Sequence, residues 1–591
     1  MIGRLATPVA LSMAGLALVA VAACANDRAG YVKPTDLVAP LPDGDAGSCP
    51  FQCSLDGRAV VRSCDGAVVE ECPDTQACGA AKCQEACAAA AADSRSDGCE
   101  FYVQNFAMND FGCLAAFIVN TSAQPVELGL DKAGVSFDLS KAVWRTNPGD
   151  ATLVEHTGPI PAGESVIFFI AGPRKPYSNP FSIRGVVTCP EGVVPATDGF
   201  ALARTGIASS LHLTASAPVS VVAMHPFGGA KSYTPAATLL MPVAAWAKEH
   251  VLVDGWEAGR PGSGKPASQI VAAEDGTQIT IIANKAIQDG IDVKGGPAHV
   301  PLQYTIDKGQ HFQIHQTEEL VGSIVVSSKP TTLFGGHSCA DIPANGAACD
   351  LLWQQIPSFA QWGSEYVGVG YRQRTASPNE LMPYRIVAAK DGTLLDYDPA
   401  IPPGAPTEMN AGDVATFPVG VNEPFVVRTQ DAAHPIYMAA YMQGGAGGYF
   451  GSQSLAYRGD PDFVNVVAAG QWLSSYSFFA DQTFDDTSLV VIRGKQRDKF
   501  EDVWLECAGT LEGWAPVGTR GDYEFVRVDL QRDGGPGQAF GDKVCQTGLQ
   551  RMKSEGPFTA TIWGWANAAS YAYPGGMALR KLVDTPLVPV Q

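Results

Sequence analysis

A sequence skeleton that occurs three times constrains the fold of this chain more than any other feature. Each copy opens with a proline before a short apolar segment, at Pro218 (PVSVVAMHP), Pro330 (PTTLFGGHS) and Pro435 (PIYMAAYMQ). A glycine-rich loop, an apolar patch and a tryptophan follow, the tryptophans being Trp246, Trp362 and Trp472. These are 116 and 110 residues apart, whereas solenoid repeats have periods of about 20 to 50 residues. The spacing therefore predicts one small domain repeated in tandem.

The tryptophans and the residues seven positions after each proline are interpreted as structural repeat positions. The latter residues are His225, His337 and Met442. A common fold needs the same residue in every unit, whereas a ligand contact does not. Because methionine replaces histidine in the third copy, we expect His225 and His337 to have packing or hydrogen-bonding roles. We expect the three tryptophans to lie in the core or between units.

The remaining sequence pattern is typical of β structure. Hairpins with tight turns are predicted in segments such as SQIVAAEDGTQITIIA and YRIVAAKDGTLLDYD. A proline is tolerated at the first residue of a strand, where the repeated prolines stand. We count about six strands in each unit of roughly 105 residues, which is the size of a β-sandwich. The predicted fold is an all-β tandem array of about four β-sandwich-like units, with a β-propeller as the alternative.

The first 23 residues have the pattern of an export signal, with Arg4 before an apolar segment. The segment ends in Val-Ala-Ala before Cys24, which resembles a bacterial lipobox and predicts lipid attachment at Cys24. The alternative is a plain secretory signal that leaves Cys24 free. Residues 24–48 are interpreted as a flexible tether. Together these features predict a lipid-anchored protein of the cell envelope, at the outer membrane or cell surface, whose lipid is its sole membrane contact.

The chain has 15 cysteines, so an even number remains after Cys24, as expected for disulfides in an exported chain. Eight of them fall between Cys49 and Cys99, and residues 49–98 are predicted to form a small disulfide-rich module. Zinc is the rival interpretation, but no histidine lies between residues 24 and 155, and we predict no metal site. The other pairs expected from their order along the chain are Cys113–Cys189, Cys339–Cys349 and Cys507–Cys545. The repeat region follows at residues 99–587, with units at about 99–227, 228–338, 339–443 and 444–587.

Several of these segments resemble the N-terminal domain of the IgGFc-binding protein family. They include SAPVSVVAMHPFGGAKSYTPAATLLMPVAAWAKEHVLV, GGHSCADIPANGAACDLLWQQIP, WGSEYVGV and SQIVAAEDGTQITI. The resemblance extends over roughly Gly98 to Leu582, and its most specific parts are the loop from Cys339 to Cys349 and the W-G-x-x-Y-V motif. It implies a secreted or surface binding domain. No contact residue for an immunoglobulin can be transferred to this sequence.

The net charge and the absence of catalytic motifs argue against several classes of function for this chain. A net charge of −20 argues against nucleic acid and anionic lipid as partners. The sequence contains no nucleophile elbow, no H-E-x-x-H helix and no paired-carboxylate motif, so we predict no catalytic residues and no cofactor. The prediction is a non-enzymatic surface binding or adhesion protein that recognises a protein or a glycan. The alternatives are an exported hydrolase acting on glycans or peptides, and a purely structural envelope protein.

Overall fold

A computed structural model describes residues 49–587 except 107–111, 173–186, 200–203, 233, 260–263, 347–348, 377–379 and 446–454. The predicted signal segment, the tether and Cys24 lie outside these residues. The described part of the chain is nearly all-β and contains a single α-helix, α1 (Ala86–Asp93), of eight residues. No helix in this part is long and apolar enough to cross a membrane. The predicted all-β class is confirmed.

A small module stapled by disulfides precedes the repeats. Its strands are β1 (Phe51–Cys53), β2 (Ala59–Arg62), β3 (Val68–Glu71), β4 (Gln76–Gly79) and β5 (Lys82–Glu85). Its disulfides are Cys49–Cys64, Cys53–Cys78, Cys72–Cys83 and Cys87–Cys99. The only apolar cluster of its own centres on Val60, so covalent links replace a core that about fifty residues cannot build. The last disulfide joins α1 to the first strand of the array.

The first two units contain the following strands. The first unit has β6 (Gly98–Val103), β7 (Leu114–Asn120), β8 (Leu128–Lys132), β9 (Val135–Ser136), β10 (Val143–Asn147), β11 (Asp150–Glu155), β12 (Ser165–Ala171), β14 (Leu211–His225) and β15 (Ala236–Leu239). The second unit has β16 (Ala247–Val251), β17 (Pro266–Ala272), β18 (Thr277–Ile282), β19 (Leu302–Ile306), β20 (Gln310–His315), β21 (Ile324–Ala340) and β22 (Asp350–Ile356). Strand β13 (Gly206–Ser209) pairs with β20 and so joins the sheet of the second unit.

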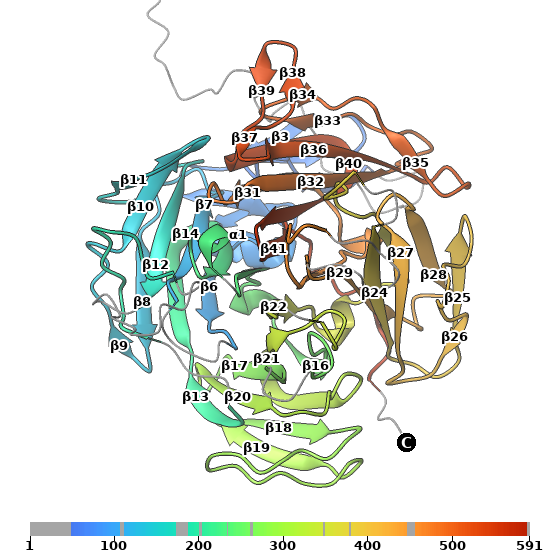
Figure 1. Cartoon of the computed structure of the whole chain (residues 1–591). Helices are drawn as coiled ribbons and strands as arrows, with labels where there is room; N and C mark the ends of the chain where they lie inside the picture. Colours follow the sequence, from blue (N-terminus) through green and yellow to red (C-terminus); the bar gives the residue numbers. More distant parts are fainter. Residues whose placement is uncertain are drawn as a thin grey trace, which may run out of the picture. The chain divides into compact units, whose positions relative to one another are not determined.

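The other two units contain the following strands, and those of the third unit form two four-stranded sheets. The third unit has β23 (Glu365–Gly368), β24 (Leu381–Ala388), β25 (Thr393–Asp398), β26 (Glu408–Met409), β27 (Val414–Gly420), β28 (Phe425–Thr429), β29 (Ile436–Met442) and β30 (Asp462–Asn465). The fourth unit has β31 (Leu473–Ala480), β32 (Asp486–Gly494), β33 (Val503–Leu505), β34 (Gly509–Thr510), β35 (Ala515–Val517), β36 (Tyr523–Arg532), β37 (Gly535–Pro536), β38 (Ala539–Phe540), β39 (Lys543–Val544), β40 (Gly548–Ala566) and β41 (Ala569–Pro574). Figure 1 shows β40 beside β32 in the fourth unit, where the two strands pair.

The repeated proline marks the point where one long strand passes from one set of partners to another. The first residues of β14 pair with β6 and β8, and the residues from Val219 onward pair with β7 and β15. Pro218 stands between these two ladders, where its missing N–H breaks no hydrogen bond. Pro330 has the same place in β21, and Pro435 opens β29 after a break in the strand. Pro557 in β40 is a fourth copy that the sequence pattern did not identify.

Because the long strand belongs to two ladders, the sheets curve as half-barrels and do not form the flat radial blades of a closed propeller. The propeller alternative is therefore wrong. Each long strand also pairs with the short strand that follows it, as β14 does with β15 and β21 with β22. The expected unit boundaries after residues 227 and 443 fall between such partners, and the one after residue 338 falls within β21.

The short strands β15, β22, β30 and β41 connect the units, because each contacts the next and β41 contacts β15. The end of the disulfide-rich module also contacts the end of the array. Ser96 N donates to Met577 O at 2.9 Å, and Leu579 N donates to Ser94 O at 2.6 Å. Each unit is therefore braced by neighbours on both sides.

Candidate functional site

The repeated tryptophans lie at the start of each unit after a single 3-10 turn. The turns are η3 (Val243–Ala245), η4 (Phe359–Gln361) and η5 (Ala469–Gln471). Each indole Nε1 donates to the carbonyl oxygen five residues earlier: Trp246 to Met241 at 3.2 Å, Trp362 to Pro357 at 3.1 Å and Trp472 to Val467 at 3.0 Å. The three rings are buried, with exposures of 8%, 1% and 4%. Rings buried to this degree present no surface to a ligand.

The ring-bearing residue four positions after each tryptophan contacts the residue that follows the repeated proline. Tyr366 OH donates to Ile436 O at 2.6 Å, and Tyr476 OH donates to Phe558 O at 2.5 Å. In the second unit, His250 Nε2 lies 3.0 Å from Thr331 Oγ1. The tryptophan part and the proline part of the sequence motif therefore contact each other. This contact joins the first strand of a unit to the point where its long strand changes partners.

His225 and His337 lie at the end of the long strand, and both are buried. His225 packs directly against Gly112, where no side chain fits. His337 Nδ1 accepts a hydrogen bond from Cys339 N at 3.1 Å. Burial lowers the pKa of each imidazole to about 3, so both rings are neutral at physiological pH.

Gln354 on β22 contacts three other units in the interior. Its Nε2, which carries two hydrogens to share, lies within hydrogen-bonding distance of carbonyl oxygens on three other short strands: Ala237 on β15 at 2.9 Å, Phe463 on β30 at 2.9 Å and Ala572 on β41 at 3.0 Å. One fully buried amide thus joins all four units. The neighbouring Gln355 Nε2 donates to Met241 O at 3.3 Å and to Thr332 Oγ1 at 2.9 Å.

Three buried aspartates stand at or just before the starts of two of these strands: Asp350, Asp460 and Asp462. Burial raises the pKa of all three, that of Asp460 to about 7, and the mutual repulsion of the carboxylates adds to the shift at Asp350. Arg374, which is also fully buried, lowers the pKa of Asp460. The cluster therefore carries less negative charge near neutral pH than its composition suggests.

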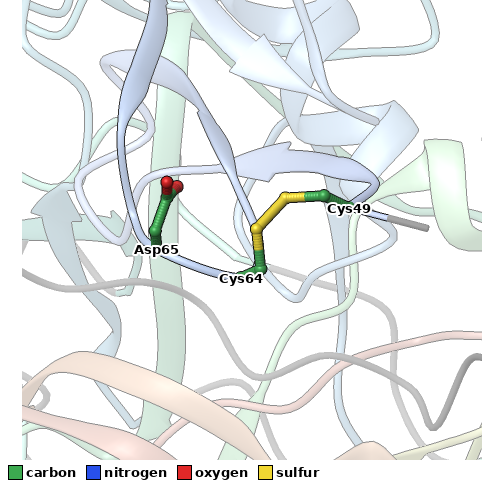
Figure 2. A group of neighbouring side chains, drawn as sticks. All are labelled: Cys49, Cys64 and Asp65. Atoms are coloured by element: carbon green, nitrogen blue, oxygen red, sulfur yellow. A yellow bond between two sulfur atoms is a disulfide. The ribbon is translucent and has the colours of Figure 1, made fainter. Parts of the chain in front are cut away.

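Only one group of described residues has the spacing of a metal site: Cys49, Cys64 and Asp65. Figure 2 shows that both sulfurs of this group are used in a disulfide, with the carboxylate beside it. A disulfide sulfur is not a thiolate ligand, so the group does not bind zinc in this form. The pairs expected from the sequence in the repeat region, Cys113–Cys189, Cys339–Cys349 and Cys507–Cys545, are the pairs present in the structure.

An open groove of 290 Å³ lies on the fourth unit, and the sequence analysis did not identify it. Trp504 on β33 and Phe500 contribute aromatic surface to it, and both are half-buried. Its charged lining residues are Lys499, Glu501, Asp502, Lys553 and Glu555. The sequence signal that could have identified this groove is that Trp504 is not one of the repeated tryptophans. This difference becomes visible only when the strands of the units are aligned by their pairing.

Comparison with known proteins gives two matches. A family model described as "IgGFc binding protein" matches residues 236–564, from the beginning of β15 to the end region of β40. The IgGFc-binding protein of Homo sapiens is 26% identical over 190 residues, which are 32% of this chain. The matched region is 3% of the length of that relative.

Proposed function

Because the family match covers more than half of its length, this chain belongs to the IgGFc-binding protein family, and we propose that it is an extracellular, non-enzymatic protein that binds a protein partner. The matched region contains β22, β30 and the larger part of the array. The family supports a binding function as the general class.

The observation that carries the proposal is the cross-bracing of the units by Gln354. A binding surface gains affinity when it is ordered before the partner arrives, because less conformational entropy is lost on association. Side-chain hydrogen bonds from Gln354 to three other units restrict the movement of the units against one another. The array is therefore suited to present a fixed surface.

The human relative is named for the Fc region of IgG. The similarity of this chain to that relative, which spans 3% of the relative's length, supports a protein as the class of partner. IgG Fc is therefore the first probe to test. The acidic balance of the chain, with a net charge of −20, favours a partner surface that is neutral or basic.

We also propose that the protein is held at the cell envelope by a lipid on Cys24. The support is the sequence Val-Ala-Ala-Cys after an apolar segment with a basic residue before it. A tether of about twenty-five residues between this anchor and the first disulfide lets the array stand clear of the bilayer.

The binding proposal is tested with the purified full-length chain in detergent, immobilised for interferometry. The probes are human IgG Fc and a fractionated set of surface proteins from neighbouring cells. We expect saturable binding of one protein, which free unlabelled chain competes away. The same chain unfolded in reductant and guanidinium is the negative control. If the folded chain binds no surface protein saturably, the proposed function is wrong.

A further inference from the structure

We propose that the groove on the fourth unit binds a neutral sugar residue, either as a free glycan or on a glycosylated partner. The inference rests on the proposed binding function, and it assigns a site and a ligand class to it.

Trp504 occupies a position where the repeated fold does not need tryptophan. It pairs across the strands with Lys553, four residues before the crossing proline Pro557. The residues at the matched place in the second and first units are Thr280 and Gly129, which pair with the residues four before Pro330 and Pro218. Unlike the buried tryptophans shared by the units, Trp504 is therefore specific to one unit and half-exposed.

The strand beneath Trp504 is firmly held. Its neighbours Val503 and Leu505 on β33 are fully buried, so Trp504 points to the opposite face. The chain is then fixed by the Cys507–Cys545 disulfide, two residues after β33 ends. The strand that carries Trp504 is therefore ordered without a ligand, as small-molecule sites usually are.

An arginine holds the part of the groove formed by residues 499–502. Arg493 Nη1 donates to Glu501 O at 3.0 Å, and its guanidinium lies 4.1 Å from the ring centroid of Trp514. Lys499 Nζ donates to Glu501 Oε2 at 2.8 Å. These contacts hold residues 499–502 beside the aromatic surface and leave the Asp502 carboxylate 83% exposed.

The chemistry of the lining matches a polyhydroxylated, uncharged ligand. One face of a pyranose ring is made of C–H groups that pack against an indole, and the hydroxyls at its edge need both donors and acceptors. Here two ammonium groups supply donors and three carboxylates supply acceptors, in a space of 290 Å³. A ligand with a large charge of either sign would meet like charges on part of the wall.

The arrangement disfavours a cationic side chain of a protein as the occupant. Lys553 Nζ lies 5.1 Å from the centroid of the Trp504 ring, so a cationic ligand that approaches this ring meets a like charge. A second cation would be repelled by the first, whereas a neutral sugar would not.

The test uses ligand-observed saturation-transfer NMR with the full-length chain and three neutral probes: lactose, cellobiose and N,N′-diacetylchitobiose. A printed glycan array extends the panel. The variant is Trp504→Thr, which introduces the residue of the matched position in the second unit and keeps a high strand propensity. The control is Tyr457→Ala, which removes an aromatic ring that is 57% exposed elsewhere on the surface.

We expect transfer to at least one probe or array glycan, an at least tenfold weaker apparent affinity with Trp504→Thr, and no change with Tyr457→Ala. Unchanged melting of the Trp504→Thr variant would show that the loss is local. The inference is wrong if no glycan binds the folded chain, or if Trp504→Thr binds as well as the wild type.

The result is separable from the test of the binding function. If a protein partner binds the wild type and Trp504→Thr equally while glycans bind neither, the sugar site fails and the binding function stands. If enzymatic deglycosylation of the partner and Trp504→Thr each weaken the complex, the sugar is carried by the partner. Binding of free glycan alone assigns the site to a free saccharide.

Discussion

Gln354 and Ala572 are 218 residues apart in the chain, yet the side-chain amide of the first donates to the carbonyl oxygen of the second at 3.0 Å. The same nitrogen reaches Ala237 and Phe463. A hydrogen-bonding side chain in the middle of the short strands thus couples units that are remote in sequence, and this coupling is open to direct measurement.

Replacing Gln354 with alanine should lower the free energy of unfolding by about 3 kcal/mol, because three buried carbonyl groups lose a donor. Denaturant unfolding followed by tryptophan fluorescence measures the change. The matched control is Gln278→Ala, an exposed glutamine on β18, which should change stability by less than about 0.5 kcal/mol. Equal effects of the two substitutions would contradict the bracing role of Gln354.

Truncation of Trp362 to alanine should lower stability by about 3 to 5 kcal/mol, because a ring that is 1% exposed leaves a large cavity. Limited proteolysis and thermal melting of the full chain report the loss. Leu394→Ala serves as the control, since this side chain is 52% exposed. A Trp362→Ala protein that melts normally but no longer binds its partner would make this tryptophan a binding residue instead.

The Cys339–Cys349 disulfide should appear in non-reducing peptide mapping as a single linked peptide pair. A closed loop with a sequence separation of 10 predicts about 2 to 3 kcal/mol of stabilisation in the chain-entropy model. The double variant Cys339→Ser/Cys349→Ser should lose that amount in denaturant unfolding. Mapping that joins either cysteine to another one would refute the pairing.

The pKa of Asp460 is raised from 3.8 to about 7 by burial, so the folded protein holds a proton that the unfolded chain releases. Its contribution to stability is present at low pH and is lost as the pH rises from about 4 to 7. We therefore expect the difference in melting temperature between wild type and Asp460→Asn to change across this window and to level off above it.

Changing Cys24 to serine should leave the protein unprocessed or release it from the membrane fraction, because the thiol is the site of lipid attachment in the proposed anchor. Fractionation of cells that express the variant, followed by mass spectrometry of the N-terminal peptide, measures both outcomes. The anchor is excluded if Cys24→Ser remains in the membrane fraction and the wild-type peptide carries no lipid.

The sequence was most informative where chemistry is local or repeated. The spacing of Pro218 and Trp246, and its recurrence, predicted a tandem β array, because a shared fold demands the same residue at the same place. The cysteine pairs in the repeat region could be proposed from their order in an exported chain. The fourth proline, Pro557, escaped detection because its copy lacks the histidine or methionine seven residues later and has Gly564 there.

The all-β class, the repeated unit and the disulfide-rich module could be predicted without a structure, since they follow from alternation, recurrence and cysteine number. The choice between half-barrels and propeller blades required the strand pairing, because it depends on which strands pair with each half of β14. The same holds for Gln354, whose three acceptors lie on other units. The exposure of Trp504 was likewise decided by long-range pairing with β40, which no local pattern encodes.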